Sequence, residues 1–514
     1  FGSSLQARSL VPVLLSQQKL ELSAWPCSFQ MAMQPGQLQR EMSMAQREMP
    51  KQQSESNKSV TASDDMNFDL PADLVAYLKE LDDFIEKEIV PLQMQDDNMR
   101  FFDQRREWAR TDFEKGGLPR KEWEKLLSEM RRRSDKAGHY RLILPPELGG
   151  KGKGNLWMAV IREHLASKGL GLHNDLQNES SIVGNFGSHL QWQLHATPEQ
   201  KKRWPNGLHA AFGLTEPDHG SDATWMETRA VFDEKAQEWI INGRKMWMTG
   251  VHTAQHAMVF ARTQGKDGDA TGITNFIVPT DAPGFEKEEF LWTFNMPSDH
   301  GRVRLTDVRV PRDSHLGPLH HGLGNGRLFL QENRLRQAAS SLGAAQYCVN
   351  ESVKYALKRA PFGQPLARNQ AIQFPLVELQ TDCAMLRELI RKTAWELDRV
   401  PKKAHGRALS DKVSMCNYRA NRLCCEAADR AIQVHGGLGY SRHLPFEHIF
   451  RHHRRYRITE GSEEIQMRNV ARVLFFDPGP MTKWDLYPGF KPPGKDRGIW
   501  DLEFNSYANT KSRL

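Results

Sequence analysis

The sequence has few of the features that mark metal, disulfide or membrane proteins. Its 514 residues include only six cysteines, and none of them forms a CxxC pair. A disulfide framework and a zinc site are therefore not indicated, and a reducing compartment fits this cysteine usage. The longest apolar run near the start, residues 10–15, is far shorter than the ~20 residues that cross a bilayer. These absences predict a soluble protein.

Three common site motifs are also missing. The chain has no HExxH pair, no Walker phosphate loop and no complete GxGxxG fingerprint, so we expect no bound metal. Hydrophobic residues make up 39% and charged residues 26%, which is typical of a folded chain with a sizeable core. The net charge of +7 and a pI near 9.0 suggest an anionic partner. Nucleic acid, a lipid surface and the phosphates of a nucleotide or CoA ligand all fit that charge.

The length predicts more than one domain, and the residue patterns indicate where each begins. Residues 1–65 are rich in Gln, Met and Ser and have almost no acidic residues before Glu41, which indicates a disordered or targeting segment. Apolar residues at three-to-four spacing predict an α-helical domain over 66–208 and a helical bundle over 319–476. A β domain is expected over 209–318, and a Pro- and Gly-rich extended tail over 477–514.

The β domain is expected to be antiparallel, with short strands separated by glycine-bearing turns. The predicted strands are 210–214, 229–232, 239–241, 257–261, 274–278 and 303–310. Asn242-Gly243 predicts a hairpin turn, and the Gly322-Leu-Gly324-Asn-Gly326 run predicts a loop between domains. Fold class is therefore α+β, in the order helix, sheet, helix.

Five segments carry a more specific signal. They are Leu214-Thr215-Glu216-Pro217 with Gly220-Ser221-Asp222; Ile241-Asn-Gly-Arg-Lys-Met-Trp247-Met-Thr249; Arg359-Ala-Pro-Phe362-Gly with Asn369-Gln370; Gln433-Val-His-Gly436-Gly437-Leu-Gly-Tyr440; and Thr459-Glu460-Gly461-Ser462-Glu463-Glu464-Ile465. In this order and spacing, from about residue 70 to 475, the chain resembles the acyl-CoA dehydrogenase family. The resemblance implies that family's fold, with an N-terminal helical domain, a middle β domain and a C-terminal four-helix bundle.

The resemblance implies FAD as cofactor. A reduced isoalloxazine ring accumulates negative charge, which fixed N–H and O–H donors stabilise. The matching positions imply that the β domain contacts the cofactor through Leu214, Thr215, Ser221, Trp247 and Thr249. Contacts to the cofactor of a neighbouring subunit are implied at Arg359, Phe362, Gln370, Gln433, Gly436 and Gly437. Two further contacts, Ser462 and Glu464, are implied beside Glu460. Substrate contacts are implied at Ser221, Arg334 and Gly461. Taken singly, each motif has a structural reading: an ordinary turn, a hairpin with a packed aromatic, or a helix-end arginine held by carboxylates.

Glu460 is the implied catalytic base. The α-proton of a thioester is weakly acidic, so its removal needs a carboxylate placed against Cα. Some relatives carry the base on another helix, directly before an arginine, but that position here is Asn333, next to Arg334. A helix N-terminal carboxylate with no catalytic task is the structural reading of Glu460.

The implied reaction is FAD-dependent α,β-dehydrogenation of a fatty acyl-CoA to the trans-2-enoyl-CoA by a homodimer or homotetramer. Electrons would pass to an acceptor flavoprotein, or to O₂ in a peroxisomal acyl-CoA oxidase. The basic cluster 451–457 leaves a non-catalytic nucleic-acid-binding flavoprotein as a further alternative, although we expect a solvated or inter-subunit face there. The final Ser512-Arg513-Leu514 resembles a peroxisomal address, and the acid-poor start leaves the mitochondrial matrix as the alternative.

Overall fold

The computed structural model describes residues 69–174 and 181–476. The expected N-terminal segment 1–65, the tail 477–514 and the Ser512–Leu514 address lie outside these residues and stay predictions. The chain divides into two units at Leu70, and the described elements belong to the unit that begins at Pro71. Within the described ranges, no helix combines the length and the apolar character needed to cross a membrane.

The first part of this unit is helical, as the periodicity predicts. Helix α2 buries Leu74, Tyr77 and Leu81 at three-to-four spacing, which is the pattern of one helical face against a core. The principal helices of this part are α2 (Ala72–Phe84), α3 (Val90–Met94), α4 (Glu107–Arg110), α5 (Lys121–Lys136), α6 (Asn155–Ser167), α7 (Gly187–His195) and α8 (Pro198–Arg203). Two short strands, β1 (Thr111–Asp112) and β2 (Leu118–Pro119), pair with each other.

The middle part is a seven-stranded sheet with the order β3-β6-β4-β5-β9-β8, and β7 pairs with β6. Its strands are β3 (Ala210–Gly213), β4 (Arg229–Asp233), β5 (Glu238–Thr249), β6 (His256–Arg262), β7 (Ile273–Pro279), β8 (Phe285–Phe290) and β9 (His300–Pro311). Most neighbours are antiparallel, whereas β3 runs parallel to β6 and β4 meets β6 in parallel at one residue pair. The sequence patterns missed β8 because its Phe-Glu-Lys-Glu-Glu-Phe run is mostly charged.

The expected turn at Asn242-Gly243 is wrong. Both residues lie inside β5, and the β4–β5 hairpin turns instead between Asp233 and Glu238. The pairing of β5 with β9 shifts register between Ile241 and Gly243. An added Cβ on Gly243 would lie 2.6 Å from the Cα of Thr228, so this glycine permits close backbone approach rather than a turn.

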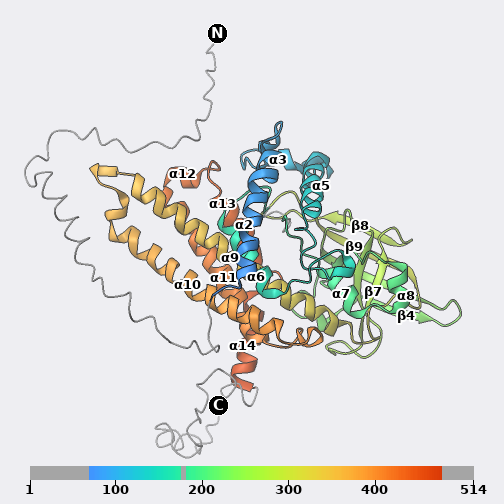
Figure 1. Ribbon diagram of the computed structural model, residues 1–514. Coiled ribbons are helices and arrows are strands. Elements are labelled where there is room, and N and C mark those ends of the chain that lie inside the picture. The colour runs from blue at the N-terminus through green and yellow to red at the C-terminus, as the bar shows by residue number, and fades with distance from the viewer. Residues whose placement is uncertain (1–68, 175–180, 477–514) are drawn as a thin grey trace, which may run out of the picture. The chain divides into compact units, whose positions relative to one another are not determined.

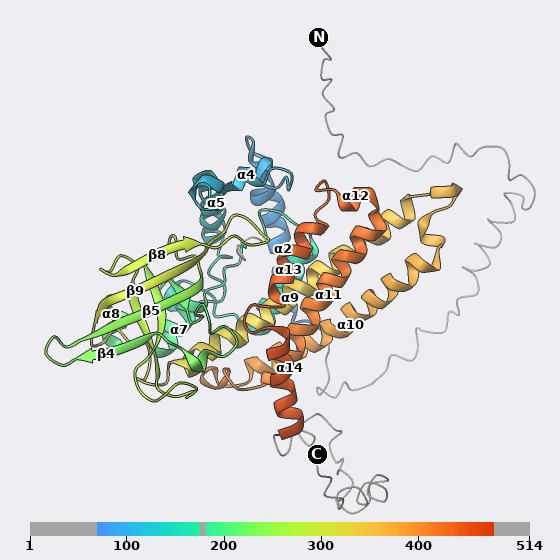
Figure 2. The ribbon, with the colours of Figure 1, turned by 180° about the vertical axis from the view of Figure 1, so that it is seen from behind.

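The C-terminal part is built on three long helices, α9 (Gly322–Lys358), α10 (Gln370–Asp398) and α11 (Ser410–His435), which run side by side in Figures 1 and 2. They share one core in which α9 contributes mainly small residues, so neighbouring helices approach its backbone closely. Shorter helices follow: α12 (Gly437–Tyr440), α13 (Phe446–Tyr456) and α14 (Glu463–Ala471). α12 and α14 mark opposite ends of this group of helices (Figure 2).

The expected loop at Gly322–Gly326 is also wrong, because α9 begins at Gly322. An added Cβ on Gly322 would lie 2.5 Å from the backbone nitrogen of Asn275 on β7, and one on Gly326 would lie 3.2 Å from the ring of Phe260 on β6. The glycines therefore let the start of α9 pack directly on the sheet. This packing outweighs the poor helix propensity of glycine.

The basic cluster at residues 451–457 is less solvated than we expected, and an inter-subunit face there stays a prediction. It belongs largely to α13, where His452 and His453 are fully buried. Arg451 and Arg457 each form ion pairs with glutamates of this chain. Because three of its seven residues, His452, His453 and Tyr456, are buried and two of its arginines are paired, it offers little charge to nucleic acid.

Candidate active site

The backbone at Glu460 adopts an unusual conformation. Its φ of +60° lies in the left-handed region, which non-glycine residues rarely enter, and Gly461 follows at +93°. The Glu460 carbonyl accepts hydrogen bonds from Nε and Nη2 of Arg334, at 2.9 and 2.7 Å, and from Nε2 of Gln466 at 3.0 Å. Charge-assisted bonds to this carbonyl offset the backbone strain and hold the turn before α14 in one shape.

The Glu460 carboxyl group is held from α9. Nδ2 of Asn333 donates to Oε1 of Glu460 at 2.7 Å, and the Glu460 side chain is half-buried. The residue that takes the place of the alternative base in the sequence therefore contacts the candidate base itself. A carboxylate held by a buried amide on a strained turn is an arrangement typical of a functional group.

The other two carboxylates of the motif have different surroundings. Glu463 pairs with Arg457 and Arg422 at 2.9 Å in each case, and these partners lower the pKa of Glu463 to about 2. Glu464 is exposed, and Ser462 precedes the first turn of α14. Glu463 thus anchors α14 to α13 and α11, which leaves Glu460 as the candidate base of this segment.

Arg334, which the resemblance implied as a substrate contact, lies beside Glu460 and has partners within the protein. It is buried, and each of its three guanidinium nitrogens donates to an oxygen of Glu460 or Gln331. The structure therefore shows Arg334 fixing the turn at Glu460. An added Cβ on Gly461 would lie 3.3 Å from Nη2 of Arg334, so Gly461 suits this site by size as well as by conformation.

The segment 214–217 is joined to β5 by a buried ion pair. Nζ of Lys245 lies 2.8 Å from Oε1 of Glu216 and 3.3 Å from the Leu214 carbonyl oxygen. The backbone N–H of Met246 donates to the Thr215 carbonyl at 2.9 Å. Thr215 is therefore held beside the stretch of β5 that carries Trp247.

Trp247 and Thr249 lie at the end of β5. Trp247 has a φ of +62°, and its side chain is 47% exposed although tryptophan is usually well buried. Oγ1 of Thr249 lies 3.1 Å from Nδ1 of His300, whose ring centroid is 6.2 Å from that of Trp247. The sequence analysis missed His300, because no motif points to a histidine at the start of β9.

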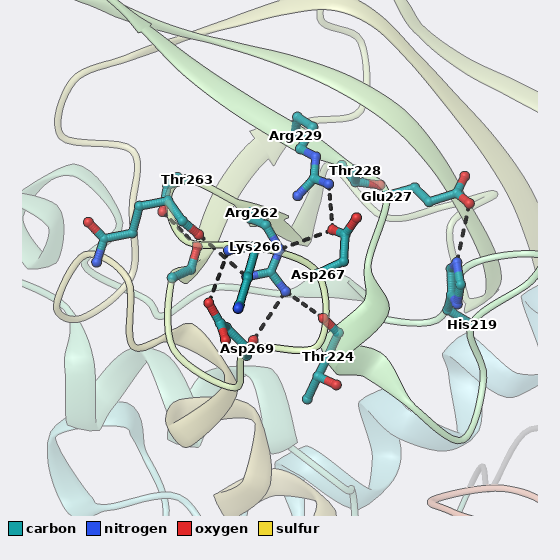
Figure 3. Close-up of polar contacts among 12 residues, drawn as sticks. His219, Thr224, Glu227, Thr228, Arg229, Arg262, Thr263, Lys266, Asp267 and Asp269 are labelled. Atoms are coloured by element: carbon teal, nitrogen blue, oxygen red, sulfur yellow. Dashed lines mark hydrogen bonds and ion pairs between the residues drawn. The ribbon is translucent and has the colours of Figure 1, made fainter.

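The loop that carries Ser221 is fixed by a buried arginine, shown in Figure 3. The Arg262 side chain is almost fully buried, and its guanidinium group donates to the carbonyl oxygens of Thr224, Gln264, Asp269 and Thr271. Ser221 itself is exposed. The sequence analysis missed Arg262 as well, because a strand-end arginine has no signature of its own.

The remaining predicted cofactor contacts form a second cluster. Arg359, Phe362, Gln370, Gln433, Gly436 and Gly437 are all exposed. Stacking of the Tyr355 and His435 rings, with centroids 4.3 Å apart, joins the ends of α9 and α11 that carry this cluster. Phe362 is fully exposed on a left-handed backbone, with a φ of +55°.

Within one chain, the second cluster lies far from Glu460 and its neighbour Arg334. Arg359 follows Arg334 by 25 residues along α9, which corresponds to about 37 Å at 1.5 Å per residue. Asn417 of α11 donates to the Arg334 carbonyl, whereas Gln433 lies near the other end of that helix. A single chain therefore cannot bring the exposed second cluster to Glu460.

The predicted cofactor contacts of the β domain, Thr215, Ser221, Trp247 and Thr249, form the first cluster, which suits the flavin ring that the resemblance implies. It offers an exposed aromatic ring at Trp247 and exposed hydroxyl groups at Ser221 and Thr249. In the second cluster, Cβ atoms added to Gly436 and Gly437 would meet nothing within 4 Å, so the backbone there is open to an approaching group. Among the residues described, no three or more His, Cys, Asp or Glu side chains are grouped as metal ligands.

Comparison with known proteins shows the family to which the chain belongs. Residues 211–308 match the model of the acyl-CoA dehydrogenase middle domain, and residues 320–475 match that of the C-terminal domain. The Bacillus subtilis protein named probable acyl-CoA dehydrogenase YngJ is 31% identical over 80% of this chain and 100% of its own length. The 3-(aryl)acrylate reductase of Clostridium sporogenes is 32% identical over 66% of this chain and 87% of its own.

The solved structure of butyryl-CoA dehydrogenase from Megasphaera elsdenii has a TM-score of 0.65 and 25% identity, and covers 80% of this chain and 100% of that one. The helical, β and helical parts follow one another here as the resemblance predicted, which confirms the expected fold class. The chain belongs to the acyl-CoA dehydrogenase family of FAD-dependent oxidoreductases that act on CH–CH groups.

Proposed function

We propose that the protein removes one hydrogen from Cα and one from Cβ of a fatty acyl-CoA, giving the trans-2-enoyl-CoA, with Glu460 as the base. The observation that carries the proposal is the Glu460 carboxyl group, which stands on a strained turn and is held at 2.7 Å by Asn333. A carboxylate in a fixed position removes a weakly acidic α-proton mainly through proximity. FAD, when bound, supplies the acceptor for the hydride that leaves Cβ.

A group of arginines near the site supports an acyl-CoA substrate. Arg327 is exposed at the surface, and partial desolvation together with repulsion from Arg407 and Arg472 lowers the pKa of its guanidinium group. Within the described part of the chain, none of the three forms an ion pair with a carboxylate. Arg327 lies two turns before Arg334 on α9, and Arg472 directly follows α14, so both flank the segment of Glu460. Their uncompensated charge suits the phosphates of CoA.

Exposed apolar side chains support a homo-oligomer. Leu357 at the end of α9, near the second cluster, is 63% exposed. Along α10, Phe374 is 59% exposed, Val377 58% and Met385 60%. A monomer rarely leaves such a group of large side chains in water. We propose that a second copy of the chain covers this face and that its Arg359 cluster completes the cofactor site of the first.

The decisive experiment is anaerobic addition of acyl-CoAs of several chain lengths to the FAD-loaded protein, while the flavin absorption band is followed. Bleaching supports dehydrogenation and ranks the substrates, whereas a band that stays unchanged with every acyl-CoA contradicts the proposal. Admission of air after bleaching distinguishes the two electron acceptors. Rapid return of the band supports an acyl-CoA oxidase that uses O₂, and slow return supports an acceptor flavoprotein.

The reductase among the relatives makes the reverse direction a second candidate. Chemically reduced protein mixed with enoyl-CoA tests it, because reoxidation that is faster than bleaching by the acyl-CoA indicates a reductase. Over residues 69–174 and 181–476, no contact favours the nucleic-acid alternative, since the cluster 451–457 is partly buried and partly ion-paired. Absence of bleaching together with steeply salt-dependent DNA binding would revive it.

A further inference from the structure

A chain of polar contacts runs from His405 to the carboxyl group of Glu460. It passes through Glu332, Arg336, Asn185 and Asn333, and it joins segments that lie far apart in the sequence. We propose that Asn333 is a positioning residue that holds the Glu460 carboxylate, and that this chain of contacts holds Asn333. The proposal rests on the proposed role of Glu460 as base.

The donors and acceptors of this chain have one consistent direction. Arg336 can only donate, and its Nη1 contacts Oδ1 of Asn185, so Asn185 presents its Nδ2 to Asn333. Oδ1 of Asn333 accepts from that Nδ2 at 3.0 Å. Asn333 must then present its own Nδ2 to Glu460, where it lies 2.7 Å from Oε1. The guanidinium group of Arg336 therefore fixes the orientation of both amides.

Arg336 is itself anchored. Its Nη2 donates to Oε2 of Glu332 at 3.1 Å, and Oε1 of Glu332 lies 3.1 Å from Nδ1 of His405. Nε2 of His405 lies 2.8 Å from the Val400 carbonyl oxygen, which can only accept. Glu332, Arg336 and His405 are all buried, so their mutual attraction is little screened by water.

This series of hydrogen bonds presents an N–H donor to Glu460. Such a donor suits the ionised carboxylate that the reaction needs. A hydrogen bond at Oε1 also restricts the rotation of the Glu460 side chain, so the carboxylate is in place before the substrate arrives. Asn333 is 3% exposed, so water cannot readily substitute for its amide. An acidic residue at 333 would instead place a second carboxylate against the base and repel its charge.

Two variants of nearly the same size separate positioning from packing. Asn333→Leu fills the space without a donor, and Asn333→Asp keeps the acceptor for Asn185 but replaces the donor to Glu460. The reporter is a 3-thia-acyl-CoA, in which sulfur replaces Cβ and no β-hydride can leave. In D₂O the Cα–H bond breaks, the proton passes to Glu460, and a deuteron returns to Cα. Mass spectrometry of the recovered thioester therefore measures proton removal alone.

We expect both variants to slow this exchange by about 10- to 100-fold, because a hydrogen bond to a charged group is lost. FAD content and the dissociation constant of the 3-thia-acyl-CoA should change by less than about threefold, so the loss falls on the rate and not on binding. Asn185→Leu should give a smaller loss in the same direction. Asn350→Leu, at an exposed position of the same helix, should leave the exchange unchanged.

Wild-type exchange rates in Asn333→Leu and Asn333→Asp, with FAD bound, would overturn the proposal and show that Asn333 only packs. Failure of the wild-type protein to exchange would instead contradict the proposed role of Glu460. If Asn333→Leu fails to fold, the exchange rate of Asn185→Leu decides: a reduced rate at unchanged thioester affinity supports positioning, and an unchanged rate overturns it.

Discussion

Nζ of Lys245 lies 2.8 Å from Oε1 of Glu216, and both side chains are buried. Burial lowers the pKa of Lys245 to about 8 despite the attraction of Glu216. Burial alone would raise the pKa of Glu216, but Lys245 and the backbone N–H groups of Glu227 and Thr228 keep it below its usual value. This pair connects the Thr215 turn to the strand that presents Trp247, so it links the two sides of the candidate flavin site.

The first prediction concerns this pair. Lys245→Met leaves the Glu216 carboxylate buried without its cation, and it should lower the free energy of unfolding by about 3–5 kcal/mol. Urea unfolding of the FAD-free protein measures the change. Lys245→Met combined with Glu216→Leu removes both charges and should recover part of the loss. A single variant as stable as the wild type would show that the pair contributes nothing net.

The second prediction concerns the loop of Ser221. Arg262→Met removes the donors that hold the Thr224 carbonyl and its neighbours, and it should weaken FAD binding by about tenfold or more. Fluorescence titration of the protein with FAD measures the affinity. Arg229→Met breaks an exposed ion pair with Asp267 in the same region and should change the affinity little. Equal effects of the two substitutions would contradict a specific role for Arg262.

The predictable parts of the fold are those with strong periodicity. α2, α10 and α11 fall within the ranges expected to be helical, and their buried residues recur at helical spacing. The strand β8 and the helical start of α9 could not be predicted in this way. Charges mask the alternation of β8, and the glycines at the start of α9 have a purpose only once the sheet beside them is known.

The site divides in the same manner. Thr215, Trp247 and Glu460 could be proposed as site residues from the sequence, because each belongs to a motif of fixed order, and their roles stay predictions. Asn333 was noticed only as the position where another carboxylate is missing, and nothing in the sequence shows that it reaches Glu460. Such partners come from segments far apart along the chain, here 127 residues, so they emerge only from tertiary packing.

The third prediction is the loss of the base. Glu460→Gln preserves the size of the side chain but removes its ability to accept the α-proton, so anaerobic bleaching by acyl-CoA should slow by about 10²- to 10⁴-fold. Stopped-flow absorbance measures the rate, and the bound flavin spectrum serves as the control for cofactor content. Bleaching at the wild-type rate with full FAD occupancy would show that another residue is the base.

The fourth prediction is a loss of stability in acid. Burial first, and nearby arginines second, lower the pKa of His448, His452 and His453, the last to about 3. Each remains neutral in the fold but takes up a proton near pH 6.5 when unfolded, so its contribution is full above about pH 6.5 and is lost as pH falls below it. His405 acts in the opposite sense, because Glu332 raises its pKa against the effect of burial.

Each of the three histidines should therefore cost about 1 kcal/mol of unfolding free energy between about pH 7 and pH 5.5. Urea unfolding across this range measures the slope. In the fold His452 is fully buried, and neither of its ring nitrogens has a hydrogen-bond partner within the described ranges. His452→Phe should accordingly reduce the slope, and an unchanged slope would place the proton uptake at other groups.

The fifth prediction tests whether two chains share each cofactor site. If the neighbour's Arg359 completes a site that otherwise belongs to the chain carrying Glu460, then Arg359→Glu and Glu460→Gln each inactivate the pure oligomer. Co-expression of the two variants restores one intact site in each mixed dimer, because one chain supplies Glu460 and the other supplies Arg359. With random pairing, about a quarter of all sites should be active.

The matched control pairs Glu460→Gln with Thr215→Ala, because the proposal assigns both positions to the contribution of the same chain to one cofactor site. In their mixed dimers every site still contains one defect, so activity should not exceed that of Thr215→Ala chains alone. Recovery in the Arg359 mixture but not in the Thr215 mixture would establish sharing between chains. Absence of recovery in both mixtures would mean that Arg359 serves its own chain, which conflicts with the separation of about 37 Å along α9 and would require a different path for the cofactor.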